Sequence, residues 1–70
     1  MDPTERKHCT EALTQAALAE GKAIAVRLAE VIAHLEKQEP LAALGAFQGL
    51  DAQLAFVGTT LTVAARLHDQ

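Results

Sequence analysis

The sequence predicts an all-α protein: an antiparallel two-helix hairpin (αα-hairpin) that completes a helical bundle by oligomerisation or by binding a partner. Its 15 alanines and 10 leucines, with two phenylalanines and neither tryptophan nor tyrosine, are a composition typical of helices. The two prolines, at positions 3 and 40, divide the chain into two uninterrupted helical patterns. Between Pro40 and Ala65, Asp51 is the one ionisable residue. A helix with so little charge needs cover on more than one face.

The first helix is expected to span about residues 3–37. Asp2 can act as the N-cap, Pro3 suits the first helical position, and Glu5 completes the pattern of a capping box. Proline disfavours a helical conformation at the residue before it, so Glu39 should lie outside the helix. A turn at about 38–39 therefore follows.

The second helix is expected to start at Pro40 and to run without a break to about His68. Arg66 and His68 would lie near its C-terminus, where positive charge complements the helix dipole. At 1.5 Å per residue the two helices are about 50 and 42 Å long, and a short connection forces them to run antiparallel. Residues 1–70 are therefore expected to form a single domain.

Helical periodicity predicts which side of the first helix faces the second. A coiled-coil stripe that also includes Gly21 consists of Leu13, Ala17, Ile24, Leu28, Val31 and Leu35. An adjoining stripe of small residues, which a neighbouring helix could approach closely, consists of Ala12, Ala16, Ala19, Ala23 and Val26. Charged and polar residues, among them Glu20, Arg27 and His34, are assigned to the solvated side.

In the second helix two apolar stripes compete for cover. The stripe expected to pack on the first helix consists of Ala43, Phe47, Leu50, Leu54, Val57, Leu61 and Ala64. A second stripe, Ala42, Gly49, Phe56 and Val63, has no partner inside the hairpin. Leaving Phe56 and Val63 in water forfeits about 1.5–3 kcal/mol each, which indicates a covering partner. The pair Gly45 and Gly49 marks either a close helix crossing or mere tolerance of glycine in an alanine-rich helix.

Charge and length argue against nucleic-acid and membrane functions. Six basic residues against nine acidic ones give a net charge of −3, which does not suit a phosphate-binding surface. The longest uncharged run, from Ala52 to Ala65, has 14 residues, and crossing a bilayer takes about 20. Neither a nucleic-acid partner nor a membrane span is expected, and the expected localisation is cytoplasmic because no leader pattern is seen.

The sequence contains no recognisable catalytic, cofactor-binding or metal-binding residues. Cys9 is a single cysteine, and His8, His34 and His68 lack the spacing of a metal site. His8 and Cys9 are adjacent, so on a helix they point in different directions and make a poor nucleophile and base. The protein is therefore expected not to be an enzyme and to take no cofactor or small-molecule substrate.

The chain has a polar first helix, which is followed by the segment FQGLDAQLAFVGTTLTVAARL at residues 47–67. In this layout it resembles the small co-chaperones of type III secretion needle subunits. The resemblance implies a protein that binds and stabilises a tetratricopeptide-repeat chaperone, so that the two keep a needle subunit soluble. The abundant alanine and the glycines depart from the family pattern. The residues expected to bind the partner are Leu50, Leu54, Phe56, Val57, Leu61 and Val63.

Two alternatives remain open from the residues themselves. One is a homodimeric four-helix bundle with a regulatory or structural role, in which two hairpins cover each other's apolar faces. The other is an antitoxin or a phage accessory protein that masks a partner by laying a helix in its groove. All three functions belong to one class, a non-enzymatic protein-interaction module.

Overall fold

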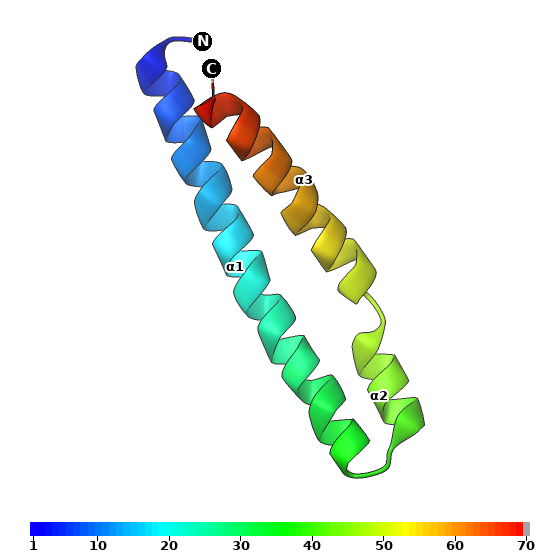
Figure 1. Cartoon of the computed structure of the whole chain (residues 1–70). Helices are drawn as coiled ribbons and strands as arrows, with labels where there is room; N and C mark the ends of the chain where they lie inside the picture. The colour runs from blue at the N-terminus through cyan, green and yellow to red at the C-terminus, as the bar shows by residue number, and fades with distance from the viewer. Residues whose placement is uncertain (70) are drawn as a thin grey trace.

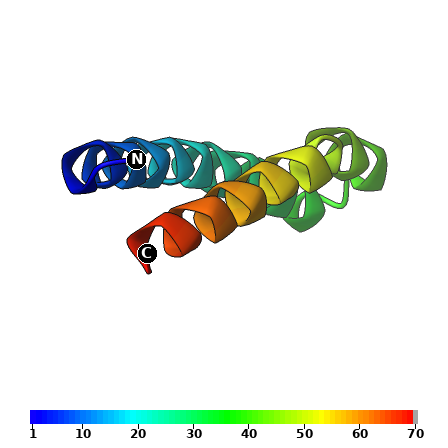
Figure 2. The ribbon, with the colours of Figure 1, turned by 90° about the horizontal axis from the view of Figure 1, so that it is seen from above.

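A computed structural model describes residues 1–69, and these residues contain three helices and no strand. Helix α1 spans Pro3–Glu36, α2 spans Pro40–Phe47 and α3 spans Leu50–His68. The predicted all-α class is confirmed. Figure 1 shows that the chain reverses after α1, so that α2 and then α3 return alongside α1 and the two ends of the chain come near each other. Seen from above, α3 is inclined to α1 (Figure 2).

Helix α1 begins at Pro3, as predicted, because its N-terminal amide groups are satisfied there. The Asp2 carboxylate accepts a hydrogen bond from the Glu5 amide at 2.8 Å, and proline occupies the first turn. At the other end the Gln38 amide donates to the Leu35 carbonyl at 3.0 Å and the Glu39 amide to the His34 carbonyl at 2.9 Å. These two bonds form a Schellman motif that ends α1 at Glu36 and reverses the chain.

The prediction of one continuous helix over 40–68 is wrong, because the helix breaks at Gln48–Gly49. Gln48 is extended, and Gly49 has a φ of 93°, in the left-handed region that glycine enters without steric cost. The break frees the Gln48 carbonyl, and the Arg27 guanidinium donates a hydrogen bond to it at 2.9 Å. Arg27 on α1 therefore stabilises the joint between α2 and α3.

The glycine pair does not mark a close helix crossing. A Cβ atom built on Gly45 would meet no heavy atom within 4 Å, and one built on Gly49 would meet only the Arg27 side chain, at 3.7 Å. Gly49 therefore serves the break rather than a close approach of two backbones.

The contact between α1 and the returning helices is a narrow seam with coiled-coil spacing. On both sides a series of buried and half-buried residues recurs at alternating intervals of three and four. On α1 they are Thr10, Leu13, Ala17, Glu20, Ile24, Arg27, Val31 and His34, and Arg6, Cys9, Ala16 and Gly21 are half-buried outside this series. On α2 and α3 they are Ala43, Ala46, Leu50, Gln53, Val57, Thr60, Ala64 and Leu67.

This seam differs from the predicted one at every second position. Phe47, Leu54 and Leu61 were expected to pack on the first helix, but they are 47%, 56% and 51% exposed. Their seam positions are taken by Ala46, Gln53 and Thr60. On α1, likewise, Leu28 and Leu35 are exposed. Glu20, Arg27 and His34, which were assigned to the solvated side, lie in the seam instead.

The molecule is elongated. Its extents are 53 × 14 × 13 Å and its radius of gyration is 16.1 Å, whereas a compact domain of this length has a radius of gyration of about 11 Å. A rod two helices wide has no interior to fill, so every helix keeps most of its surface outside the seam.

Gly49→Ala tests the break. We expect it to lower the free energy of unfolding by about 1–2 kcal/mol, because alanine is strained in the left-handed region. Gly45→Ala is the matched control. Gly45 lies inside α2 with open space around it, so the substitution should raise the free energy of unfolding by up to about 1 kcal/mol. Urea unfolding followed by circular dichroism measures both, and stabilisation by both substitutions would instead indicate a continuous helix through residue 49.

Candidate functional site

Eight of the thirteen exposed large apolar side chains lie along one flank of the seam, which we call the leucine face. It is made of Leu18, Leu28, Ile32 and Leu35 on α1 with Leu44, Phe47, Leu54 and Leu61 on α2 and α3. On each helix these residues follow one another at helical spacing on the same side of the seam. Leu18 and Leu61 line one hollow together, so the two halves form a single surface.

The opposite flank is the alanine face. Its α1 half is made of Ala12, Ala16, Ala19, Ala23 and Val26, and its α3 half carries Phe56 and Val63. Phe56 is 47% and Val63 42% exposed. Ala23 and Val26 line a shallow hollow together with Arg27, Glu30 and Gln53, and this hollow joins the two helices on this flank. The surface is thus a flat floor of small residues beside two larger apolar side chains.

The structure distributes the six residues predicted to bind a partner over three surfaces. Leu50, only 4% exposed, and the half-buried Val57 lie in the seam against α1. Leu54 and Leu61 lie on the leucine face. Phe56 and Val63 lie on the alanine face. One continuous patch made of all six therefore does not exist.

Six members of the leucine face were not among the predicted partner-binding residues. They are Leu18, Leu28, Ile32, Leu35, Leu44 and Phe47. A signal for the α1 half is present in the sequence: positions 14, 18, 21, 25, 28, 32 and 35 form a second stripe with alternating spacings of four and three and without a charge. Only the structure shows that this stripe lies beside the seam rather than in it.

The leucine face has two different halves. Toward the open end, a groove between α1 and α3 is lined in succession by Thr10, Thr14, Ala17, Leu18, Gly21, Lys22, Ala25, Val57, Leu61, Ala64, Ala65, His68 and Asp69. Its middle section is an open hollow of about 450 Å³, and apart from Lys22 and Thr14 its lining is apolar. Toward the turn, a cluster of large exposed side chains consists of Leu28, Ile32, Leu35, Leu44 and Phe47. One end of the face is thus hollow and the other is bulky.

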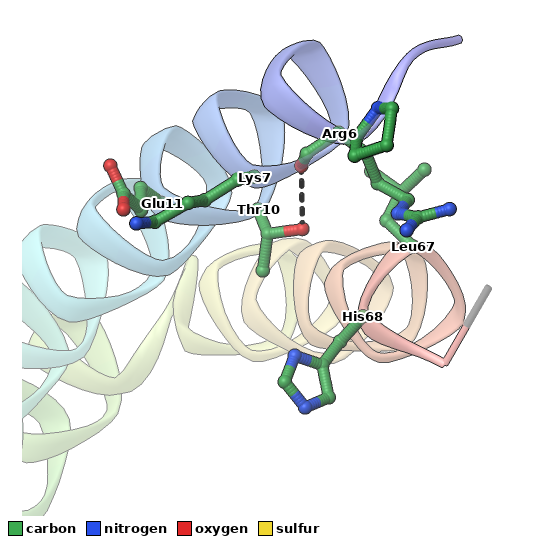
Figure 3. A pocket seen from close by; sticks show the side chains of 7 residues that line it. Arg6, Lys7, Thr10, Glu11, Leu67 and His68 are labelled. Atoms are coloured by element: carbon green, nitrogen blue, oxygen red, sulfur yellow. Dashed lines mark hydrogen bonds between the residues drawn. The ribbon is translucent and has the colours of Figure 1, made fainter.

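Figure 3 shows the outer end of this groove, where Arg6, Lys7 and Glu11 of α1 lie near Leu67 and His68 of α3. The Thr10 hydroxyl donates to the Arg6 carbonyl at 2.9 Å and is thereby committed to its own helix. The His68 ring extends from α3 away from the α1 side chains (Figure 3). The polar groups at this end border the groove and do not converge on a common point.

A small polar layer interrupts the seam near its middle. The Gln53 amide nitrogen donates to a Glu20 carboxylate oxygen at 2.9 Å, while the buried Gln53 amide oxygen has no hydrogen-bond partner. A buried polar group without a partner costs about 1–3 kcal/mol. Arg27, about two turns further along α1 than Glu20, donates a hydrogen bond to the Gln48 carbonyl. The layer costs stability and fixes which residues of α1 and α3 meet.

The remaining polar side chains are dispersed. Cys9 is a half-buried free thiol, and within residues 1–69 no three histidine, cysteine or acidic side chains are grouped so that they could hold a metal ion. His34 lies beside Glu39 at 3.1 Å near the turn, and its side chain is half-buried.

The segment Pro40–His68 is long and apolar enough, by length and composition alone, to cross a membrane. One such segment is weak evidence for a span. In the structure the break at Gln48–Gly49 divides it into helices of 8 and 19 residues. Asp51 lies in the first turn of the longer one.

Comparison of the chain with protein-family models, with curated proteins and with solved structures finds no match. The exposed apolar surfaces are therefore the features of this chain that indicate its functional class.

The polar layer can be tested by replacing both of its members. We expect Glu20→Leu combined with Gln53→Leu to raise the free energy of unfolding by about 1 kcal/mol or more, because paired polar groups give way to apolar packing. Gln53→Leu alone leaves the Glu20 carboxylate without its hydrogen-bond donor, so it should raise the free energy of unfolding by less. A double-mutant cycle by urea unfolding measures the coupling, and a double variant less stable than the wild type would show that the pair contributes net stability.

Proposed function

We propose that this chain is a non-enzymatic protein-interaction module, a helical hairpin that is completed by packing on other helices. One observation carries the proposal. Within residues 1–69, thirteen large apolar side chains are exposed, whereas two, Val31 and Leu50, are buried. Folded soluble proteins keep large contiguous apolar patches for interaction sites. This excess of exposed over buried large apolar side chains is typical of a subunit and not of an independent domain.

The alanine face is the surface that we assign to a partner of different sequence. Phe56 and Val63 are seven residues apart, about 10 Å along α3, on the same side of the helix. They project beside a floor of alanines, where a partner helix can approach closely and take the two side chains between its own. Helices that bind in a groove commonly anchor through apolar residues at such spacings.

The co-chaperone resemblance supplies the kind of partner. A tetratricopeptide-repeat chaperone stacks helix pairs into a superhelix with a concave binding surface, which suits a slender helical rod. In this role the chain stabilises the repeat protein and through it a secretion needle subunit. We propose a cytoplasmic location for the chain, and we propose neither a nucleic-acid partner nor a membrane span.

Co-expression tests this function. A tagged chain is produced together with the products of the genes adjacent to its own, and we expect a stoichiometric complex with a helical-repeat protein. Phe56→Asp should reduce recovery of the partner at least tenfold, because an anchor is replaced by a charge in an apolar contact. Ala55→Asp, which places the same charge one residue away on the exposed outer side of α3, should leave the complex intact.

Circular dichroism of both variants controls for folding. A complex that survives Phe56→Asp and is lost in a leucine-face variant would move the partner to the other flank. The absence of a complex with every neighbouring product, for a chain that folds cooperatively by itself, would contradict the proposed function.

A further inference from the structure

The surface area of the chain exceeds that of a compact monomer by about the size of one interface. The accessible surface is 5070 Å², whereas a compact monomeric protein of 7.4 kDa exposes about 4,200 Å². The excess is on the order of 900 Å², and a standard protein interface buries about 800 Å² on each partner. One interface of ordinary size would therefore restore the area of a normal folded protein.

The leucine face is the place where this area can be buried in a single contact. It extends along all three helices. At its stripe positions, which are 14, 18, 21, 25, 28, 32 and 35 on α1 and 44, 47, 51, 54, 58, 61 and 65 on α2 and α3, Asp51 is the one charged residue, and Lys22 lines the groove beside them. A surface with so little charge is typical of the core of a permanent interface rather than of a transient contact.

The shape of the leucine face is complementary to itself. The bulky cluster, Leu28, Ile32, Leu35, Leu44 and Phe47, occupies the end near the turn, and the apolar groove occupies the other end of the same face. When a second copy is turned end for end and laid on this face, its cluster lies over the groove of the first, and the reverse holds as well. Such an arrangement is the isologous contact of a two-fold dimer, in which each copy supplies both the projection and the hollow.

We infer that the leucine face is the interface between two copies of this chain, stacked antiparallel, with the cluster of each copy seated in the groove of the other. The dimer is a four-helix bundle. Its two-fold axis passes near Gly21 and Ala25, at the end of the groove that adjoins the cluster, where small side chains let the two α1 helices approach closely. The two alanine faces point outward in this dimer, so the partner site proposed above stays accessible.

Sedimentation equilibrium of the full chain tests the dimer. We expect a mass of twice 7.4 kDa at micromolar concentration. Ile32→Asp, in the middle of the cluster, should raise the dimer dissociation constant at least tenfold, because a charge would have to enter the apolar groove. Ala29→Asp places the same charge on the outer side of α1 and should leave the dimer unchanged. A monomeric wild type, or a dimer that Ile32→Asp does not weaken, would overturn the inference.

Cross-linking tests the orientation and does not depend on a destabilised variant. Two variants are made with Cys9→Ala, one carrying Ala25→Cys and the other Leu35→Cys, and each is treated with a short bismaleimide. Antiparallel stacking brings the two copies of residue 25 together near the axis and holds the two copies of residue 35 roughly 35 Å apart at 1.5 Å per residue. We therefore expect a cross-linked dimer for the first variant only. Efficient cross-linking through residue 35 would overturn the antiparallel arrangement.

These results are separable from the proposed partner binding. Phe56→Asp should abolish the complex with the partner and retain the dimer, whereas Ile32→Asp should weaken the dimer. Loss of dimer in Phe56→Asp as well as in Ile32→Asp would contradict the separation of the two faces.

Discussion

The seam between α1 and the returning helices is the constraint on which the rest of the structure depends. It combines large apolar residues such as Ile24, Val31 and Leu50 with small ones such as Ala17 and Ala43 and with polar ones such as Glu20 and Gln53. Such a seam holds the helices close and in register, but it buries little apolar area, and burial of apolar area is the main source of folding free energy. Six of the leucines and both phenylalanines lie on the flanks instead. We therefore propose that much of the stability of the fold comes from what covers those flanks.

The polar seam contributes specificity in return for its cost. Gln53 can reach the Glu20 carboxylate only when α3 has one particular position along α1, and Arg27 reaches the Gln48 carbonyl in that same register. Polar residues at core positions of coiled coils commonly fix register and partner number at a cost in stability. The break at Gly49 leaves the Gln48 carbonyl open to Arg27, so the joint between α2 and α3 is tied to this same register.

Much of the secondary structure could be predicted from local chemistry. The N-cap at Asp2 and the proline at position 40 act on their immediate neighbours, so they define the start of α1 and the reversal of the chain without reference to the tertiary structure. The break at Gly49 could not be predicted in the same way. An interior glycine is compatible with a helix at a modest cost, and it is the carbonyl contact from Arg27, 21 residues away, that accompanies the broken form.

The candidate site was predictable only in part, for a physical reason. Counting apolar residues along a helix selects its most apolar stripe, and the sequence interpretation placed that stripe, with Leu28, Leu54 and Leu61, inside the hairpin. In a chain that shares its apolar residues between internal and external contacts, the most apolar stripe can belong to the external one. Phe56 and Val63 were correctly expected to be left uncovered by the first helix, since their flank adjoins the seam in either assignment.

We propose that association between chains provides much of the stability of this fold, and the dependence of thermal unfolding on protein concentration tests this proposal most directly. Melting followed by circular dichroism over a hundredfold range of concentration should show a midpoint that rises steadily with concentration, because dimer formation stabilises the folded state by mass action. A cooperative transition with the same midpoint at every concentration would show that the hairpin is stable alone and would contradict the account.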